Sequence, residues 1–240
     1  MKKGGFHTNT PVHDPAVFVD RDGSYYIFGT HMTAATSKDL RYWESFADGV
    51  NGENPLFSNL FDEDMEAFRY CGKFDGKEYA VWAPDVSYNP YLKKYVMYFC
   101  TSGSYIKSTI CMATADEAKG PYHFERVILY SGFDEDTIDE TNVKAVLPEG
   151  EDLSHYFKKH GKYNNLSWPN CIDPNSLHDK SGRLWMVYGS WSGGIFLIEI
   201  DEHTGLLIHP EPDGKNQVDA YFGRKLLGGG HKSIEGPFIL

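Results

Sequence analysis

A short unit recurs along this chain, and it constrains the fold more than any other feature of the sequence. Each copy places an acidic residue near a turn residue and a short strand, then a polar turn and an aromatic strand. The acids that lead the copies are Asp14, Asp85, Asp173 and Glu235. Repeated strand units of this kind predict small sheets arranged about one axis, as in the blades of a propeller. Because the first strand of a blade lines the axis, the leading carboxylates are expected to converge there.

Strand signals dominate the chain, and no amphipathic helix longer than about two turns is indicated. Runs rich in β-branched and aromatic residues predict strands at 16–19, 25–30, 95–101, 109–113, 184–190 and 195–200. Polar turn sequences that join successive strands occupy residues 21–24, 89–94 and 179–183. The uneven spacing of the copies indicates inserts between them. We therefore expect one all-β domain over residues 1–240.

Two long polar inserts, residues 48–80 and 131–165, interrupt the repeat. Their acidic runs lack the spacing of an EF-hand calcium loop, so we expect solvated loops that shape a binding cleft on a rigid scaffold. The chain has 4 cysteines, widely spaced and without a Cys-x-x-Cys pair. This spacing argues against a zinc site or a disulfide framework and predicts buried thiols.

The charge of the chain limits its partners. With 23 basic and 34 acidic residues the formal net charge is −11, which argues against nucleic acid or an anionic membrane surface as partner. No apolar run approaches the length of a membrane span. Residues 1–6 carry positive charge without an apolar run behind it, so no signal peptide is expected, and the chain is either cytoplasmic or a mature extracellular form. The sequence does not indicate an oligomeric state.

Four motifs in the order found here resemble glycoside hydrolase family 43, the five-bladed β-propeller hydrolases of arabinan and xylan, and among these the endo-1,5-α-L-arabinanases. They are His13-Asp14-Pro15, Trp82-Ala83-Pro84-Asp85, Ile172-Asp173-Pro174-Asn175 and Glu235-Gly236-Pro237. The resemblance covers roughly residues 11–240. It implies an all-β, five-bladed β-propeller that is truncated within the first strand of the fourth blade.

The resemblance also implies an inverting hydrolase and a role for three of the acids. Asp14 matches the general base that deprotonates the attacking water, and Glu235 matches the general acid that protonates the leaving oxygen. Asp173 matches the third carboxylate, which orients the acid and raises its pKa. An inverting site holds its base and acid about 6.5–9.5 Å apart, because a water molecule has to fit between them.

Several neighbours of these acids are expected to bind the sugar. Trp82 offers a ring that can stack on a sugar face, and Gly103 allows close backbone approach. His13 is expected to contact substrate or to position the base. The full predicted set is His13, Trp82, Gly103, Asn170, Ser190, Trp191 and Ser192.

Calcium in the central channel is a further implication of the resemblance. No protein ligand for it is identified in this sequence, and His231 does not match the histidine that the last blade of related arabinanases supplies. The leading hypothesis is cleavage within α-1,5-linked arabinan, with arabinan or arabino-oligosaccharide as the partner. A β-xylosidase or α-L-arabinofuranosidase of the same family, and a non-catalytic carbohydrate-binding propeller, stay open as alternatives.

Overall fold

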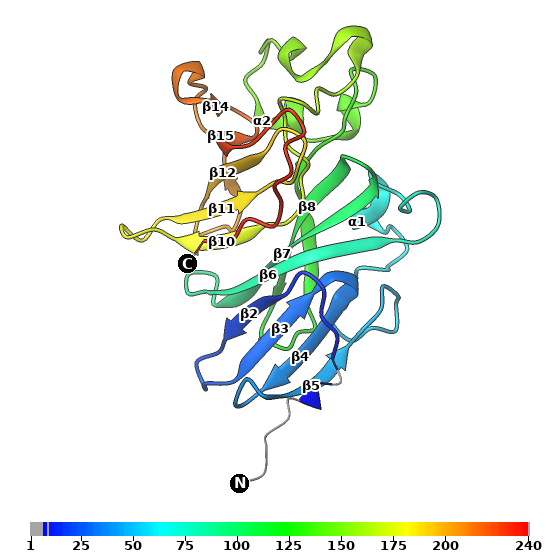
Figure 1. The fold of residues 1–240 in the computed structure, drawn as a ribbon, viewed down its shortest axis with the longest axis vertical. Coiled ribbons are helices and arrows are strands. Elements are labelled where there is room, and N and C mark those ends of the chain that lie inside the picture. The colour runs from blue at the N-terminus through cyan, green and yellow to red at the C-terminus, as the bar shows by residue number, and fades with distance from the viewer. Residues whose placement is uncertain (1–6, 9, 240) are drawn as a thin grey trace.

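The chain forms three sheets that succeed one another along the long axis of the molecule (Figure 1). The structure, a computed structural model, describes residues 7–8 and 10–239. The predictions made for residues 1–6, and for the strand end at Leu240, lie outside the described residues. None of the helices in the described part of the chain has the length and apolarity needed to cross a bilayer.

The first sheet is an antiparallel meander of four strands with one short parallel strand at its outer edge, in the order β1-β5-β4-β3-β2. Its strands are β1 (His7–Thr8), β2 (Ala16–Val19), β3 (Tyr25–Gly29), β4 (Thr33–Ser37) and β5 (Tyr42–Ala47). The hairpin predicted at 21–24 is confirmed. Asp20 and Ser24 close it by a backbone hydrogen bond of 2.9 Å, and Gly23 supplies the left-handed conformation, with φ 79°.

The second and third sheets repeat this pattern. The second is the meander β6 (Ala80–Asn89), β7 (Lys94–Ser104), β8 (Lys107–Ala115) and β9 (His123–Tyr130). The third contains β10 (Asn175–His178), β11 (Leu184–Tyr188), β12 (Ile195–Ile200), β13 (Leu207–Ile208), β14 (Val218–Asp219) and β15 (Gly223–Leu227). Within it β10, β11, β12 and β15 run antiparallel in that order.

All six predicted strands form, although two end early. The second stops at Gly29, and the fifth stops at Tyr188 because the Gly189 amide leaves the ladder to donate to the Ile172 carbonyl. Sequence reasoning assigned no bounds to β4, β5 and β9, and among these only β4, with the sequence TAATS, consists of small and polar residues.

Helical structure is confined to short pieces, as predicted. The α-helices are α1 (Glu66–Arg69) and α2 (Val143–Val146). The 3₁₀ turns are η1 (Thr30–Met32), η2 (Ile138–Glu140), η3 (Ser154–Tyr156), η4 (Lys159–Gly161) and η5 (Gly214–Asn216).

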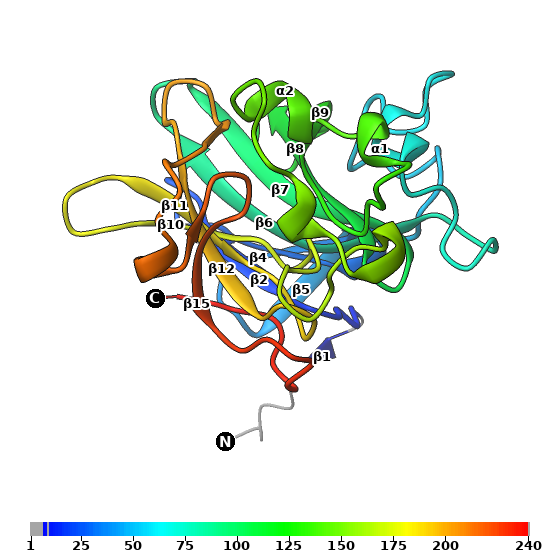
Figure 2. The same ribbon diagram turned by 90° about the horizontal axis from the view of Figure 1, so that it is seen from above.

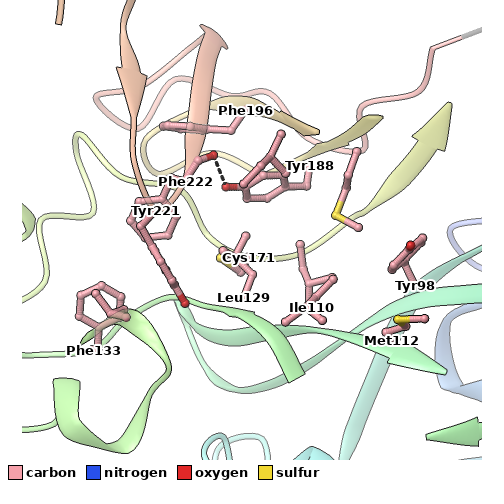
Figure 3. Packing of buried hydrophobic residues seen from close by; sticks show 14 of the residues in the cluster. Tyr98, Ile110, Met112, Leu129, Phe133, Cys171, Tyr188, Phe196, Tyr221 and Phe222 are labelled. Atoms are coloured by element: carbon pink, nitrogen blue, oxygen red, sulfur yellow. Dashed lines mark hydrogen bonds between the residues drawn. The ribbon is translucent and has the colours of Figure 1, made fainter. Parts of the chain in front are cut away.

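A large aromatic core lies between the second and third sheets (Figure 3). Tyr98 and Met112 of the second sheet face Tyr188 of the third, whose hydroxyl donates to the Phe222 carbonyl across 2.7 Å. The insert 131–165 contributes Phe133, which is fully buried in this cluster. The acidic runs 134–136 and 148–152 of this insert are largely exposed, as expected, whereas its aromatic side chains are buried or partly buried and complete the core.

The cysteines behave as predicted. Cys71, Cys100, Cys111 and Cys171 are all free and buried. Burial raises the pKa of the Cys71 thiol to about 11, which leaves it protonated and unreactive at neutral pH.

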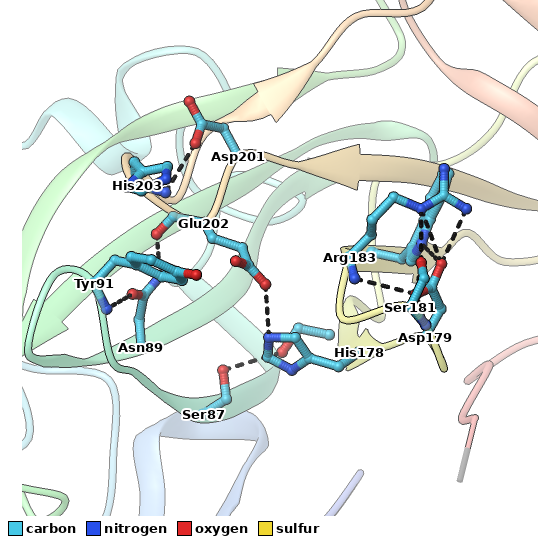
Figure 4. A network of polar contacts seen from close by, with 12 residues as sticks. Ser87, Asn89, Tyr91, His178, Asp179, Ser181, Arg183, Asp201, Glu202 and His203 are labelled. Carbon is cyan, nitrogen blue, oxygen red and sulfur yellow. Dashed lines mark hydrogen bonds and ion pairs between the residues drawn. The ribbon is translucent and has the colours of Figure 1, made fainter.

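Polar contacts also join the second and third sheets (Figure 4). The Asn89 side chain, at the end of β6, donates to the Glu202 carbonyl across 2.8 Å. His178 Nε2, at the end of β10, lies 3.2 Å from Oε1 of the same glutamate. These two contacts hold the C-terminal end of β6 and the C-terminal end of β10.

The first strands of the sheets meet, since β6 packs against both β2 and β10. Seen from above, along the axis on which the sheets succeed one another, the first sheet lies behind the second and third (Figure 2). The segment 228–239 follows the third sheet and runs beside β10, where the Ile239 amide donates to Asn175 Oδ1 across 3.1 Å. The first strand predicted for a fourth sheet does not form within residues 233–239, because no ladder partner lies beside it there.

Candidate active site

The three acids with predicted catalytic roles line one cleft of about 880 Å³. Asp14 precedes β2 and Asp173 precedes β10, so the first and third sheets each deliver one carboxylate from the start of their first strand. Glu235 lies on the segment 228–239. The first strands of the sheets meet along one line. Side chains at the beginning of these strands therefore lie close together although they are far apart in the sequence.

The four motifs share one backbone conformation at the residue that precedes the proline. In all four motifs the residue before the proline has a positive φ, at 50° for Asp14, 41° for Ala83, 56° for Asp173 and 59° for Gly236. Residues other than glycine rarely adopt this left-handed region, and Asp tolerates it better than most. The repeat is therefore in register at the proline. This alignment corrects the repeat assigned from sequence, because the equivalent of Asp14 in the second sheet is Ala83 and not Asp85.

Asp85 has a different task. It is buried between the second and third sheets, where its carboxylate accepts hydrogen bonds from the Ser176 amide at 2.8 Å and the Ser176 hydroxyl at 2.6 Å. Asn175 Nδ2 adds a third donor at 3.3 Å. Burial raises the pKa of Asp85. The carboxylate joins the two sheets beneath the cleft.

Electrostatics single out Asp173 among the acids of the cleft. Burial is the main cause that raises the pKa of Asp173 from 3.8 to about 6, and the charges of Asp14 and Glu235 add to it. The Gly236 amide donates to its Oδ2 across 3.2 Å and acts in the opposite direction. Asp173 thus keeps its proton to a higher pH than a free aspartic acid does.

Asp14 is held on one oxygen. Its Oδ2 accepts a hydrogen bond of 2.6 Å from the Thr30 hydroxyl and lies 2.7 Å from His13 Nδ1. The side chain is 43% exposed, so water reaches the carboxylate. His13 lines the cleft beside Asp14, in agreement with its predicted place next to the base.

Glu235 is held by Trp191. The indole Nε1 donates to Glu235 Oε2 across 3.0 Å, and the Trp191 amide donates to the Ile234 carbonyl across 2.6 Å. Trp191 was expected to contact sugar, and the structure places it against the acid with 39% of its surface exposed. Its neighbours Ser190 and Ser192 are buried and do not line the cleft.

Of the remaining predicted sugar contacts, only Trp82 lines the cleft. An irregularity in the β6–β7 ladder between Trp82 and Asp85 sets its position, and its ring packs edge-on against Phe74 with centroids 5.0 Å apart. Gly103 and Asn170 lie away from the cleft. A Cβ on Gly103 would lie 1.8 Å from the Cys71 carbonyl oxygen, so backbone packing explains this glycine. Asn170 is buried, with its Oδ1 3.5 Å from the Ser131 hydroxyl.

Sequence reasoning missed four residues with polar side chains that line the cleft: Thr30, His31, Thr33 and Asp48. Asp48, the first residue of the insert 48–80, lines the cleft, whereas no residue of the insert 131–165 does, so the expectation that the inserts shape the cleft holds for the first insert alone.

The donor set for a calcium ion was also tested. Across residues 7–8 and 10–239, no group of three or more His, Cys, Asp or Glu side chains is arranged to hold a metal ion. Carboxylate side chains among the described residues therefore do not supply the several oxygen ligands that calcium prefers.

Comparisons with known proteins agree with the geometry, although no family model matches the chain. The chain is 36% identical over 229 residues to extracellular endo-α-(1→5)-L-arabinanase 2 of Bacillus subtilis (strain 168), covering 95% of this chain and 41% of that protein. It is 38% identical over 232 residues to extracellular endo-α-(1→5)-L-arabinanase of Thermotoga petrophila, covering 95% and 42%. The chain thus spans about two fifths of the length of these relatives.

A solved structure gives the same result. The glycoside hydrolase family 43 protein YxiA of Bacillus licheniformis superimposes with a TM-score of 0.73 at 34% identity, over 94% of this chain and 43% of that one. The structure has successive antiparallel sheets that bring acids to one cleft. Together with the similarity to these relatives, this arrangement identifies the sequence as arabinanase-like and similar to glycoside hydrolases. The chain is therefore similar to glycoside hydrolase family 43 proteins, and it spans about two fifths of the length of the relatives it matches.

Proposed function

We propose that the protein containing this chain hydrolyses α-1,5-linked arabinan with inversion at the anomeric carbon. The observation that carries the proposal is the single cleft lined by Asp14, Asp173 and Glu235. The relatives that are 36% and 38% identical are both endo-α-(1→5)-L-arabinanases, which supports arabinan over xylan as the substrate.

In this mechanism Asp14 takes a proton from water as the water oxygen bonds to the anomeric carbon. Glu235 gives its proton to the glycosidic oxygen as the bond from that oxygen to the anomeric carbon breaks. Asp14 ends protonated and Glu235 ionised, and exchange with solvent restores both. The indole N–H of Trp191, 3.0 Å from Glu235 Oε2, stabilises the charge that develops on the acid.

Asp173 acts on this pair through charge and through the backbone. It accepts the amide proton of Gly236, the residue next to Glu235, and thereby orients the segment that carries the acid. Trp82 offers its ring to a sugar face in the cleft. Calcium has no ligand set among the described residues, and no step of this mechanism passes through it.

We infer that the three sheets are blades of a five-bladed propeller that the chain shares with its relatives, which are more than twice as long. Exposed apolar side chains support this inference. Val17 and Val19 of β2 are 50% and 55% exposed, and Leu227 of β15 is 50% exposed. These positions on the first and third sheets carry apolar surface of the kind that an adjacent blade would cover.

Hydrolysis of linear arabinan by the full-length protein tests the proposal, with linear xylan as the competing substrate. We expect arabino-oligosaccharides of several lengths, released with inverted anomeric configuration in ¹H NMR. Asp14→Ala and Glu235→Ala should each lower kcat by several orders of magnitude while oligosaccharide binding persists. Asp116→Ala is the matched control, since Asp116 is 83% exposed and pairs only with Lys94 on the surface.

Other outcomes would replace the proposal. Release of single arabinose units alone would indicate exo action by an α-L-arabinofuranosidase. Cleavage of xylan without arabinan would indicate a β-xylosidase. Binding of arabino-oligosaccharide with no turnover, unchanged by Asp14→Ala, would establish a carbohydrate-binding propeller.

A further inference from the structure

Thr30 connects the predicted base to the neighbouring sheet by two hydrogen bonds. Its hydroxyl donates to Asp14 Oδ2 across 2.6 Å. The same oxygen accepts the amide proton of Ala83, in β6, across 3.1 Å. Nothing in the sequence repeat or in the roles assigned so far gives Thr30 a function.

The second bond fixes the direction of the first. A hydroxyl carries one proton and two lone pairs, and the Ala83 N–H occupies a lone pair of the Thr30 oxygen. The hydroxyl proton is then directed to Asp14. Thr30 is 6% exposed, so little water competes for either bond, whereas the Asp14 side chain is open to the cleft.

The backbone holds Thr30 in this place. Its amide donates to the His13 carbonyl across 2.9 Å, directly before Asp14 in the chain. Gly29 makes this approach possible, because a Cβ there would lie 2.5 Å from the His13 carbonyl oxygen and 2.3 Å from Val12 Cγ1. On the other side Ala83 has the left-handed φ of 41° in the irregular part of β6. The end of β3 and the irregular part of β6 therefore both determine the Thr30 position.

The consequence for Asp14 is an asymmetry between its two oxygens. Oδ2 receives the Thr30 proton and lies 2.7 Å from His13 Nδ1. Oδ1 has no hydrogen-bond partner among the described residues. We propose that Thr30 is a positioning residue, which fixes the rotation of the Asp14 carboxylate and leaves Oδ1 to accept the proton of the attacking water. This role rests on the proposed function of Asp14 as general base.

The test compares Thr30→Val, which keeps the shape but removes the hydroxyl, with Thr30→Ser, which keeps the hydroxyl. Full-length variants are assayed on linear arabinan. We expect Thr30→Val to lower kcat roughly 10- to 100-fold, the range for a lost hydrogen bond to a charged group, with KM within about twofold. Thr30→Ser should keep kcat within about threefold. Thr36→Val is the control, because its hydroxyl donates to the Tyr25 carbonyl in the same sheet and away from the cleft.

Equal losses in Thr30→Val and Thr30→Ser would overturn the inference, since the hydroxyl that serine keeps would then have preserved no activity. Unchanged kcat in Thr30→Val would overturn it as well, while activity of the parent would leave the proposed function standing.

Crystal structures of the parent and Thr30→Val decide the question even if the parent does not cleave arabinan. We expect the Asp14 carboxylate to rotate or to occupy more than one orientation in Thr30→Val, and to keep one orientation in the parent. An Asp14 carboxylate that keeps its orientation in both would end the inference.

Discussion

The indole nitrogen of Trp191 donates a hydrogen bond to Oε2 of Glu235 across 3.0 Å. Both residues lie in segments with unusual backbone. Trp191 has a φ of 42°, and its amide also holds the Ile234 carbonyl. The tryptophan thus fixes the acid through its side chain and through the backbone of the preceding residue, although no regular strand or helix carries Glu235.

Trp191→Phe removes this N–H while keeping an aromatic ring. We expect kcat on linear arabinan to fall roughly 10-fold, because the charge that develops on Glu235 loses a donor. Steady-state kinetics measure the effect. Trp185→Phe is a matched control, since Trp185 donates to Asp179 across 3.0 Å away from the cleft. A loss in Trp185→Phe as large as that in Trp191→Phe would contradict the role given to Trp191.

Asp173→Asn is expected to stabilise the fold at neutral pH. The folded state raises the pKa of Asp173 from 3.8 to about 6, so the folded state binds more protons than the unfolded chain between about pH 4 and 6. Stability from this group is therefore present at low pH and is lost as the pH rises through about 6. The asparagine keeps an acceptor for Gly236 and carries no charge.

Urea unfolding at pH 4 and pH 8 measures this difference. We expect Asp173→Asn to exceed the parent by about 1–2 kcal/mol at pH 8 and to match it near pH 4, since each pKa unit is worth about 1.4 kcal/mol and partial exposure reduces the effect. Asp39→Asn should change stability in the opposite direction, because hydrogen bonds from the Tyr42 and Arg41 amides lower the pKa of Asp39. A stability gain that is the same at both pH values would refute the linkage.

Asp85→Ala should destabilise the protein without touching the cleft acids. The buried Ser176 amide and hydroxyl both lose their acceptor, and a cavity forms between the second and third sheets. We expect the free energy of unfolding to fall by about 2–4 kcal/mol. Chemical denaturation measures the loss, and Asp116→Ala on the exposed Lys94 pair should cost less than about 1 kcal/mol. Equal costs in the two variants would contradict the joining role of Asp85.

Gly103→Ala tests whether close backbone packing, and not the predicted sugar binding, requires a glycine at this position. The added methyl group would meet the Cys71 carbonyl oxygen at 1.8 Å, so we expect a loss of about 3 kcal/mol or more. Gly214→Ala is the control, because nothing lies within 4 Å of a Cβ there. Thermal denaturation and soluble yield compare the two. A Gly103→Ala protein that is as stable as Gly214→Ala, but binds sugar poorly, would restore the original assignment.

The sequence repeat predicted where the sheets begin, and the structure brings Asp14, Asp173 and Glu235 to one cleft as expected. It aligned the second and fourth copies wrongly because acids were matched with acids, whereas the backbone repeats at the prolines and places Ala83 and Gly236 at the position of Asp14. Asp85 lies two residues beyond Ala83, the backbone equivalent of Asp14, and packing between sheets buries it.

Two contacts at the site lay beyond the reach of sequence reasoning for a physical reason. Thr30 and Asp14 are separated by 16 residues, and Trp191 and Glu235 by 44. Each hydrogen bond depends on the orientation of a loop or of a strand end in the folded protein. The periodicity of hydrophobic residues in the sequence does not predict that orientation. The buried aromatics of the insert 131–165 were visible in the sequence, but its acidic runs and length favoured a loop.

At the residue before each proline, the left-handed backbone conformation is independent of whether the side chain is ionisable. Ala83 adopts the same conformation as Asp14 and Asp173 with a methyl group in place of a carboxylate. A sheet of this design can therefore exchange an ionisable group for an inert one by a single codon change, and the neighbouring strands need not be rebuilt. Divergence within such an architecture can redistribute acids among equivalent repeats while the fold itself is inherited intact.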